Sequence, residues 1–166
     1  MYPAEGLKRL LYDRFIHLSH LSEELFAAEE SAIAELLQEH GITFSSTSLT
    51  SIHVLDCIGN NEPINSTAIA DKMKLSKASI TKISTKLLQD DCIKRNRMND
   101  NKKEFYFSLT PKGRKLFDLH ARMHEQFEQK FLESMNSFTE PELQASLKFV
   151  QTMIDYSPTS PRKVGL

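Results

Sequence analysis

Two histidines, His120 and His124, stand four residues apart in a segment that has the apolar spacing of a helix. That spacing places both imidazoles on one helical face, where they can bind one divalent ion. A zinc protease would carry a glutamate directly after the first histidine as a base, but Ala121 occupies that position. The pair therefore predicts a binding site rather than a hydrolytic one; the alternative is an ordinary pair of surface or interface histidines.

A concentrated basic region is the second feature of the sequence that indicates a binding function. Between Lys72 and Lys115 there are 13 Lys and Arg against 4 Asp and Glu, whereas the remainder has 8 against 18. The formal net charge of -1 hides this separation. A local basic patch is the electrostatic footprint of a phosphate-binding surface, so we expect double-stranded DNA as a partner.

The same region predicts a helix-turn-helix followed by a basic hairpin. A first helix is expected over 66–73 with Ser66 as its N-cap, and a second from Lys77 to about Asp90 with Ser76 as its N-cap. Strands over 93–97 and 104–109, joined by a polar turn, predict a wing. In the second helix an apolar stripe faces inward, which leaves polar and basic side chains outside, as a helix in the DNA major groove requires.

Long helices are expected on both sides of this lobe. Apolar spacing predicts one from Leu7 to about Gln38, acidic in its second half, and a shorter one over 48–58. After the wing, Thr110 and Pro111 are suited to start a helix that runs to about Ser134, and Thr139 to Glu142 form a capping box for a last one. The expected fold is mainly α with a small β-wing. Its parts are an N-terminal dimerisation helix and loop (1–47), a winged helix-turn-helix lobe (48–110), C-terminal dimerisation helices (111–156) and a disordered tail (157–166).

The terminal segments carry more apolar residues than a small winged helix can cover, so we expect them to pair with a second copy of the chain. A two-fold dimer also supplies two reading heads for the half-sites of a palindrome. The alternative is that these helices fold back on their own lobe.

Composition narrows the class of protein. The 40% hydrophobic and 26% charged contents are ordinary for a globular protein, and no apolar run is long enough for a membrane span. The N-terminus has no signal-peptide pattern, and the two cysteines, Cys57 and Cys92, have no metal-motif or redox-motif spacing. The expected location is therefore the cytoplasm.

Segments "IADKMKLSKASITKISTKLLQDDCIKR" and "FSLTPKGRKL" give the chain a resemblance to the MarR family of winged-helix transcriptional regulators, over about residues 7–156. The resemblance implies that the second helix of the helix-turn-helix enters the major groove and that the wing reaches the flanking backbone or minor groove. The side chains then expected to face DNA are Ser76, Lys77, Ser79, Thr81, Lys82 and Lys86 on the helix, and Arg95, Arg97, Lys102 and Lys103 on the wing. Lys102 stands where the family usually has an arginine, which favours backbone contact over minor-groove recognition.

Within that family the chain is similar to the zinc-responsive repressors of zinc uptake in Gram-positive bacteria. Their pattern has a glutamate late in the first helix, a histidine in the second and two histidines in the fifth. Carried over through "AELLQEH", "SIHVL" and "LHARMHE", it implies the ligands Glu35, His53, His120 and His124. Positions matching a second metal site of those repressors, Gly41, Ile52 and Leu119, hold no ligand.

The resemblance implies a repressor whose DNA affinity rises when zinc, or another divalent transition metal, ties its helices together. A regulator released from DNA by a small organic or phenolic ligand is the nearer alternative. A metal-dependent enzyme is the other, but the chain shows no general base beside the histidine pair and no phosphate-cradling glycine-rich loop.

Overall fold

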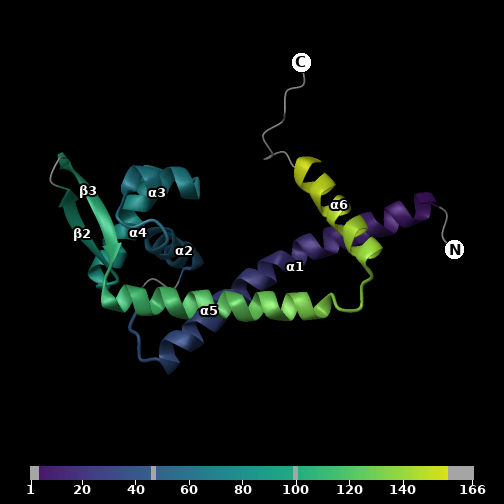
Figure 1. The fold of residues 1–166 in the computed structure, drawn as a ribbon, viewed down its shortest axis with the longest axis horizontal. Coiled ribbons are helices and arrows are strands. Elements are labelled where there is room, and N and C mark those ends of the chain that lie inside the picture. Colours follow the sequence, from purple (N-terminus) through teal and green to yellow (C-terminus); the bar gives the residue numbers. More distant parts are fainter. Residues whose placement is uncertain (1–3, 46–47, 99–100, 157–166) are drawn as a thin grey trace, which may run out of the picture. The chain divides into compact units, whose positions relative to one another are not determined.

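The computed structural model describes residues 4–45, 48–98 and 101–156, with side chains placed except at 98 and 101–103. These residues form six helices and three strands (Figure 1). The helices are α1 (Ala4–Glu39), α2 (Leu49–Gly59), α3 (Ser66–Met73), α4 (Lys77–Gln89), α5 (Pro111–Ser134) and α6 (Glu140–Tyr156). The strands are β1 (Ile64–Asn65), β2 (Ile93–Met98) and β3 (Asn101–Leu109). The expected mainly helical fold with a β-wing is confirmed.

Helix ends follow the capping residues of the sequence in most places. Ser76 accepts a hydrogen bond from the Ser79 N–H at 3.1 Å and so caps α4 as predicted. The Thr110 hydroxyl likewise accepts from the Gly113 N–H at 3.0 Å at the start of α5. For α3 the cap is Asn65, whose side chain accepts from the Ala68 N–H, rather than the expected Ser66. Asn65 takes this role because it is the last extended residue before the helix.

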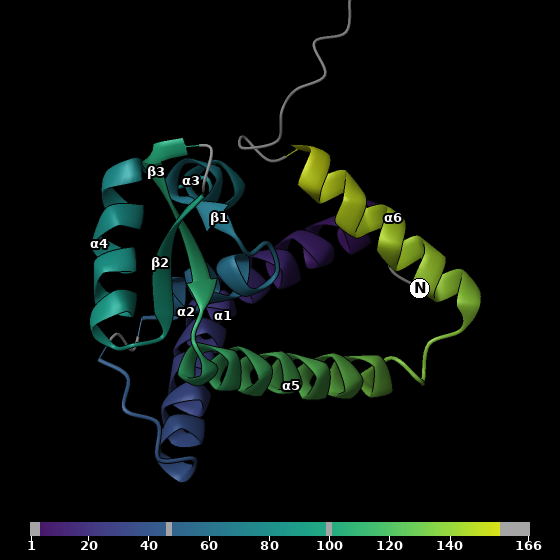
Figure 2. The ribbon, with the colours of Figure 1, turned by 60° about the vertical axis from the view of Figure 1, so that its left-hand side comes forward.

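The three strands form one antiparallel sheet in the order β1-β3-β2, and Figure 2 shows α4 beside β2. Ile93 pairs with Leu109 and Arg97 with Phe105, so the β2–β3 hairpin is the expected wing. Strand β1 was not predicted, because two residues are too few to show an alternating pattern. Its Ile64 pairs with Phe107, and both are buried.

Helix α2 is the central element of the first compact unit, residues 1–122. Ile52, Val54, Leu55 and Ile58 of α2 are fully buried, and α2 packs against α3, α4 and β3. Burying each such side chain contributes about 1.5–3 kcal/mol to folding stability, so α2 is a main source of hydrophobic stabilisation in this unit. His53 and Asp56, on the same helix, are only partly buried and lie at the edge of this core.

The second compact unit begins at Met123 and holds the end of α5 and all of α6. Thr139 and Glu142 cap α6 as predicted, because Thr139 donates its N–H and its hydroxyl to the Glu142 carboxylate at 2.8 and 2.6 Å. The unit boundary lies within α5, and the expected division at residues 47, 110 and 156 stays a prediction. Among the described residues, no helix is long and apolar enough to cross a membrane.

Candidate metal centre and DNA interface

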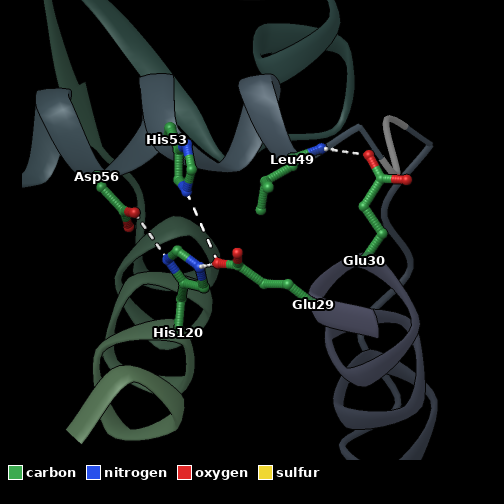
Figure 3. A network of polar contacts seen from close by, with 6 residues as sticks. All are labelled: Glu29, Glu30, Leu49, His53, Asp56 and His120. Atoms are coloured by element: carbon green, nitrogen blue, oxygen red, sulfur yellow. Dashed lines mark hydrogen bonds and ion pairs between the residues drawn. The ribbon is translucent and has the colours of Figure 1, made fainter. Parts of the chain in front are cut away.

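Three helices bring Glu29, His53 and His120 together. Glu29 Oε1 lies 3.8 Å from His53 Nε2 and 3.5 Å from His120 Nε2 (Figure 3). The two imidazole rings are 5.7 Å apart between centroids. Because Glu29 comes from α1, His53 from α2 and His120 from α5, we call this group the three-helix cluster.

Apolar packing aims Glu29 at the two histidines. Ile33 and Leu37 are the buried residues of α1, and both line a small cavity together with Leu116 and His120 of α5. Glu29 precedes Ile33 by four residues, about one helical turn, and therefore shares its inward face. Because Ile33 and Leu37 pack toward α5, the Glu29 carboxylate on the same face of α1 also points toward α5.

Asp56 fixes the orientation of His120. Its Oδ2 lies 2.7 Å from His120 Nδ1, and the His120 side chain is only 1% exposed. A neutral imidazole carries one N–H, and the carboxylate accepts it from Nδ1, so the lone pair of Nε2 faces Glu29 and His53. Burial lowers the pKa of His120, but the hydrogen bond and charge of Asp56, with Glu29, outweigh it and hold the pKa above the usual 6.5.

The residue after Glu29 connects α1 to α2 in a second place. Glu30 Oε1 accepts a hydrogen bond from the Leu49 N–H at 3.1 Å (Figure 3). Ser48, at the N-cap position of α2, makes no side-chain capping bond, so the carboxylate of Glu30 satisfies this helix end instead. Two consecutive carboxylates of α1 thus hold two points of α2.

The three-helix cluster has the chemistry of a metal site. One ligand atom from each of its residues lies within 4.8 Å of the others, close enough to share an ion. Imidazole nitrogen and carboxylate oxygen are ligands that zinc and its neighbours accept. His124 follows His120 by about one helical turn on α5, and so lies on the same helical face as predicted.

Glu35, the carboxylate expected at this site, is not in the cluster. It is exposed, and it lies two residues from both Ile33 and Leu37. Two residues correspond to about 200° around a helix, so Glu35 is on the side of α1 opposite the buried stripe. The structure therefore brings Glu29, and not the expected Glu35, beside His53 and His120, while the set of metal ligands stays a prediction.

Two residues of the site were missed by the sequence reasoning, although each has a signal. Glu29 shares the helical face of the apolar residues Ile33 and Leu37, which a helical projection of α1 displays. Asp56 follows His53 by three residues and so lies on the same face of α2. The acidic half of α1 offers six glutamates, and counting along the chain cannot choose among them.

Helix α4 presents the predicted polar face. Ser76, Lys77, Thr81, Lys82 and Lys86 are exposed and Ser79 is half-buried, whereas Ile80 and Leu87 are fully buried. On the wing Arg95 and Arg97 are exposed. The side chains of Lys102 and Lys103 lie outside the described part of the structure.

Comparison with known proteins gives the family of this chain. The model of the MarR family matches residues 47–105, which span α2, the helix-turn-helix and most of the wing. The HTH-type transcriptional regulator PchR of Bacillus subtilis (strain 168) is 43% identical over 146 residues, covering 88% of this chain and 86% of PchR. The chain belongs to the MarR family.

Solved structures of MarR-family proteins agree with this assignment. Lactococcus lactis ZitR, whose wild-type structure is in complex with DNA, is 28% identical, with a TM-score of 0.58 over 67% of this chain and 75% of ZitR. Streptococcus pneumoniae FabT, also in complex with DNA, is 21% identical and shares the fold, with a TM-score of 0.69 over 86% of this chain and 94% of FabT. As a MarR-family winged-helix protein, the chain is a DNA-binding transcriptional regulator and not an enzyme.

Proposed function

We propose that this MarR-family regulator is a homodimeric repressor of a palindromic operator and that a bound divalent metal, by ligand type zinc, controls its DNA affinity. The observation that carries the proposal is the convergence of Glu29, His53 and His120 from three helices. Glu29, His53 and His120 would hold the ion, with His124 as the fourth ligand from the same face of α5. The ion would act as a structural crosslink.

Metal binding would reach the DNA-binding surface through α2. Helix α2 supplies His53 to the cluster and packs against both α3 and α4. An ion shared by α1, α2 and α5 favours the conformer in which these helices are close together. Where that conformer spaces the two DNA-binding lobes of the dimer to match the operator, zinc raises DNA affinity, because it binds this conformer more tightly than the other and so increases its population.

Exposed apolar side chains support the homodimer in each unit taken alone. In the first unit Leu18 and Leu25 of α1 are 59% and 64% exposed. In the second unit Phe131 and Leu147 are 62% and 70% exposed. Rows of such residues on long helices are typical of a subunit interface, and a two-fold interface suits a palindromic site.

The DNA contacts are assigned to α4 and the wing. The exposed residues Ser76, Lys77, Thr81, Lys82 and Lys86 would lie in or beside the major groove, with Ser79 at its edge. Arg95 and Arg97, together with Lys102 and Lys103, would contact the flanking backbone. ZitR, a relative with 28% identity, has a structure in complex with DNA, which supports DNA as the partner of this chain.

A zinc competition titration against a chromophoric chelator tests the metal site. Wild type should bind one tight equivalent per chain, and Glu29→Gln and His120→Ala should each weaken it at least tenfold. Glu35→Gln is the matched control, because it removes a carboxylate from the exposed side of the same helix, and its affinity should equal that of wild type. Equal loss in the Glu29 and Glu35 variants would contradict the assignment.

DNA affinity tests the control mechanism. A duplex selected from a random-sequence library on the zinc-loaded protein would be titrated with zinc-loaded and chelator-treated protein. Zinc should tighten binding at least fivefold in wild type and leave Glu29→Gln unaffected. Equal affinity of the two wild-type forms would refute metal control and leave DNA binding intact.

Release by a small organic ligand is the second candidate. A cavity of about 300 Å³ between α2 and α4, lined in part by Ser48, Leu75, Lys82 and Lys86, is in the size range of small-ligand pockets. Under this alternative the histidines are ordinary polar residues, and zinc would change neither the DNA affinity of wild type nor that of His120→Ala.

A further inference from the structure

Phe105 of the wing is contacted by two arginines. The guanidinium carbon of Arg95 lies 4.1 Å from the centroid of the Phe105 ring, and that of Arg97 lies 4.9 Å from it. Arg97 is the direct cross-strand partner of Phe105, and Arg95 precedes Arg97 by two residues on the same face of β2. Both distances are within the range of cation–π interactions.

Phe105 lies at the outer end of the buried apolar residues of β3. Leu109 and Phe107 share its face of β3, and both are buried. Phe105 is the next residue outward on that face and is only half-buried. Its ring thus lies where the apolar side chains of β3 leave the core, and two guanidiniums lie over it.

Within the described residues neither Arg95 nor Arg97 has a carboxylate within 4.0 Å, whereas Arg114 pairs with Glu62. A ring beneath a guanidinium restricts the side chain without occupying its N–H donors. Two arginines held in this way can offer planar, paired donors to phosphate oxygens, the geometry in which arginine binds phosphate most specifically.

We propose that Phe105 is a positioning residue for DNA binding: its ring holds Arg95 and Arg97 on one face of the wing as a clamp for backbone phosphates. Phe105 itself touches no DNA in this arrangement and acts through the two arginines. The proposal rests on the DNA-binding function of the family and is independent of any metal.

A double-mutant cycle tests this role. Affinity for a fluorescein-labelled, mixed-sequence duplex is measured by anisotropy for wild type, Phe105→Leu, Arg95→Ala/Arg97→Ala and the triple variant. Phe105→Leu should bind about threefold to tenfold more weakly than wild type, the order of one or two exposed cation–π contacts. In the double-alanine background the same change should have no effect, because the groups through which Phe105 acts are absent.

Two further readouts distinguish positioning from damage to the wing. Phe105→Tyr retains the ring face and should bind as wild type does. Phe105→Leu keeps both charges, so its salt dependence should match that of wild type, while Arg97→Ala should make the log–log salt slope shallower by about 1. Wild-type affinity in Phe105→Leu, or an equal loss in the wild-type and double-alanine backgrounds, would overturn the proposal.

Discussion

Removing the Asp56 carboxylate should weaken the proposed metal site without removing a ligand. In Asp56→Ala, His120 loses its hydrogen-bond acceptor, the Asp56 Oδ2 that lies 2.7 Å from His120 Nδ1 and keeps the proton on that nitrogen. The neutral imidazole can then place its proton on Nε2, the atom that faces Glu29, and the ring loses a fixed orientation. Losing such an outer partner typically lowers metal affinity 10- to 100-fold, or by about 1.4–2.7 kcal/mol.

The same substitution has a cost in stability. The His120 side chain is 1% exposed, so water cannot easily replace the lost carboxylate. A buried donor left without its acceptor costs about 1–3 kcal/mol, and the lower half of that range is expected because Asp56 itself is 23% exposed. Urea unfolding of the metal-free protein measures this cost separately from zinc affinity.

Asp56→Asn is the matched control, because its amide oxygen can still accept the Nδ1 hydrogen bond although the charge is gone. We expect its zinc affinity to lie within about threefold of wild type if orientation is the main contribution. Zinc titration of both variants decides the matter. Wild-type affinity in Asp56→Ala would refute the reasoning, and equal losses in the two variants would show that the charge, not the hydrogen bond, is what the site needs.

Three further predictions concern stability and reactivity. Folding raises the pKa of His120, so the stabilisation from its protonated ring is fully present below the unfolded value of 6.5 and is lost as pH rises through the folded pKa. Urea unfolding of chelator-treated protein should therefore give a lower stability at about pH 8.5 than at about pH 6. In His120→Gln this difference between the two pH values should be smaller. Gly113→Ala should destabilise the protein by about 2–4 kcal/mol in the same assay, because the new Cβ would lie 1.8 Å from the Cys92 carbonyl oxygen; an unchanged midpoint would contradict that packing. Burial raises the pKa of Cys92 to about 11 and also raises that of Cys57, so neither thiol should react with Ellman's reagent in the native state, and rapid labelling of either would indicate an exposed thiol.

The fold was predictable where local chemistry decides local structure. Ser76 and Thr110 mark the starts of α4 and α5 because their hydroxyls accept backbone N–H groups, and alternating residues mark the wing. Strand β1 was missed because its two residues are extended only through pairing with β3. The cap of α3 was misplaced by one residue, since Asn65 and Ser66 are both good N-caps and only the backbone conformation chooses between them.

The candidate site was predictable in its histidines but not in its carboxylate. His120 and His124 are related by helical spacing within one segment, which a sequence displays. The distance between His53 and a glutamate of α1 depends on a loop and on how two helices pack. The number of residues between them determines neither. The buried stripe of Ile33 and Leu37 carries the missing information, since it decides which glutamates turn inward.

The consecutive carboxylates Glu29 and Glu30 have a consequence for how this site can change. Because both are anchored to α2, to His53 and to the Leu49 N–H, helix packing sets their register and the connecting loop does not. The start of that loop is itself packed, because Phe44 is buried and Ser45 donates its N–H and its hydroxyl to Asp90. One residue inserted within α1 between Glu30 and Ile33 would turn Glu29 by about 100° relative to the buried stripe and abolish the site. A single-residue shift in α1 should thus remove metal binding while every ligand residue is still present in the chain.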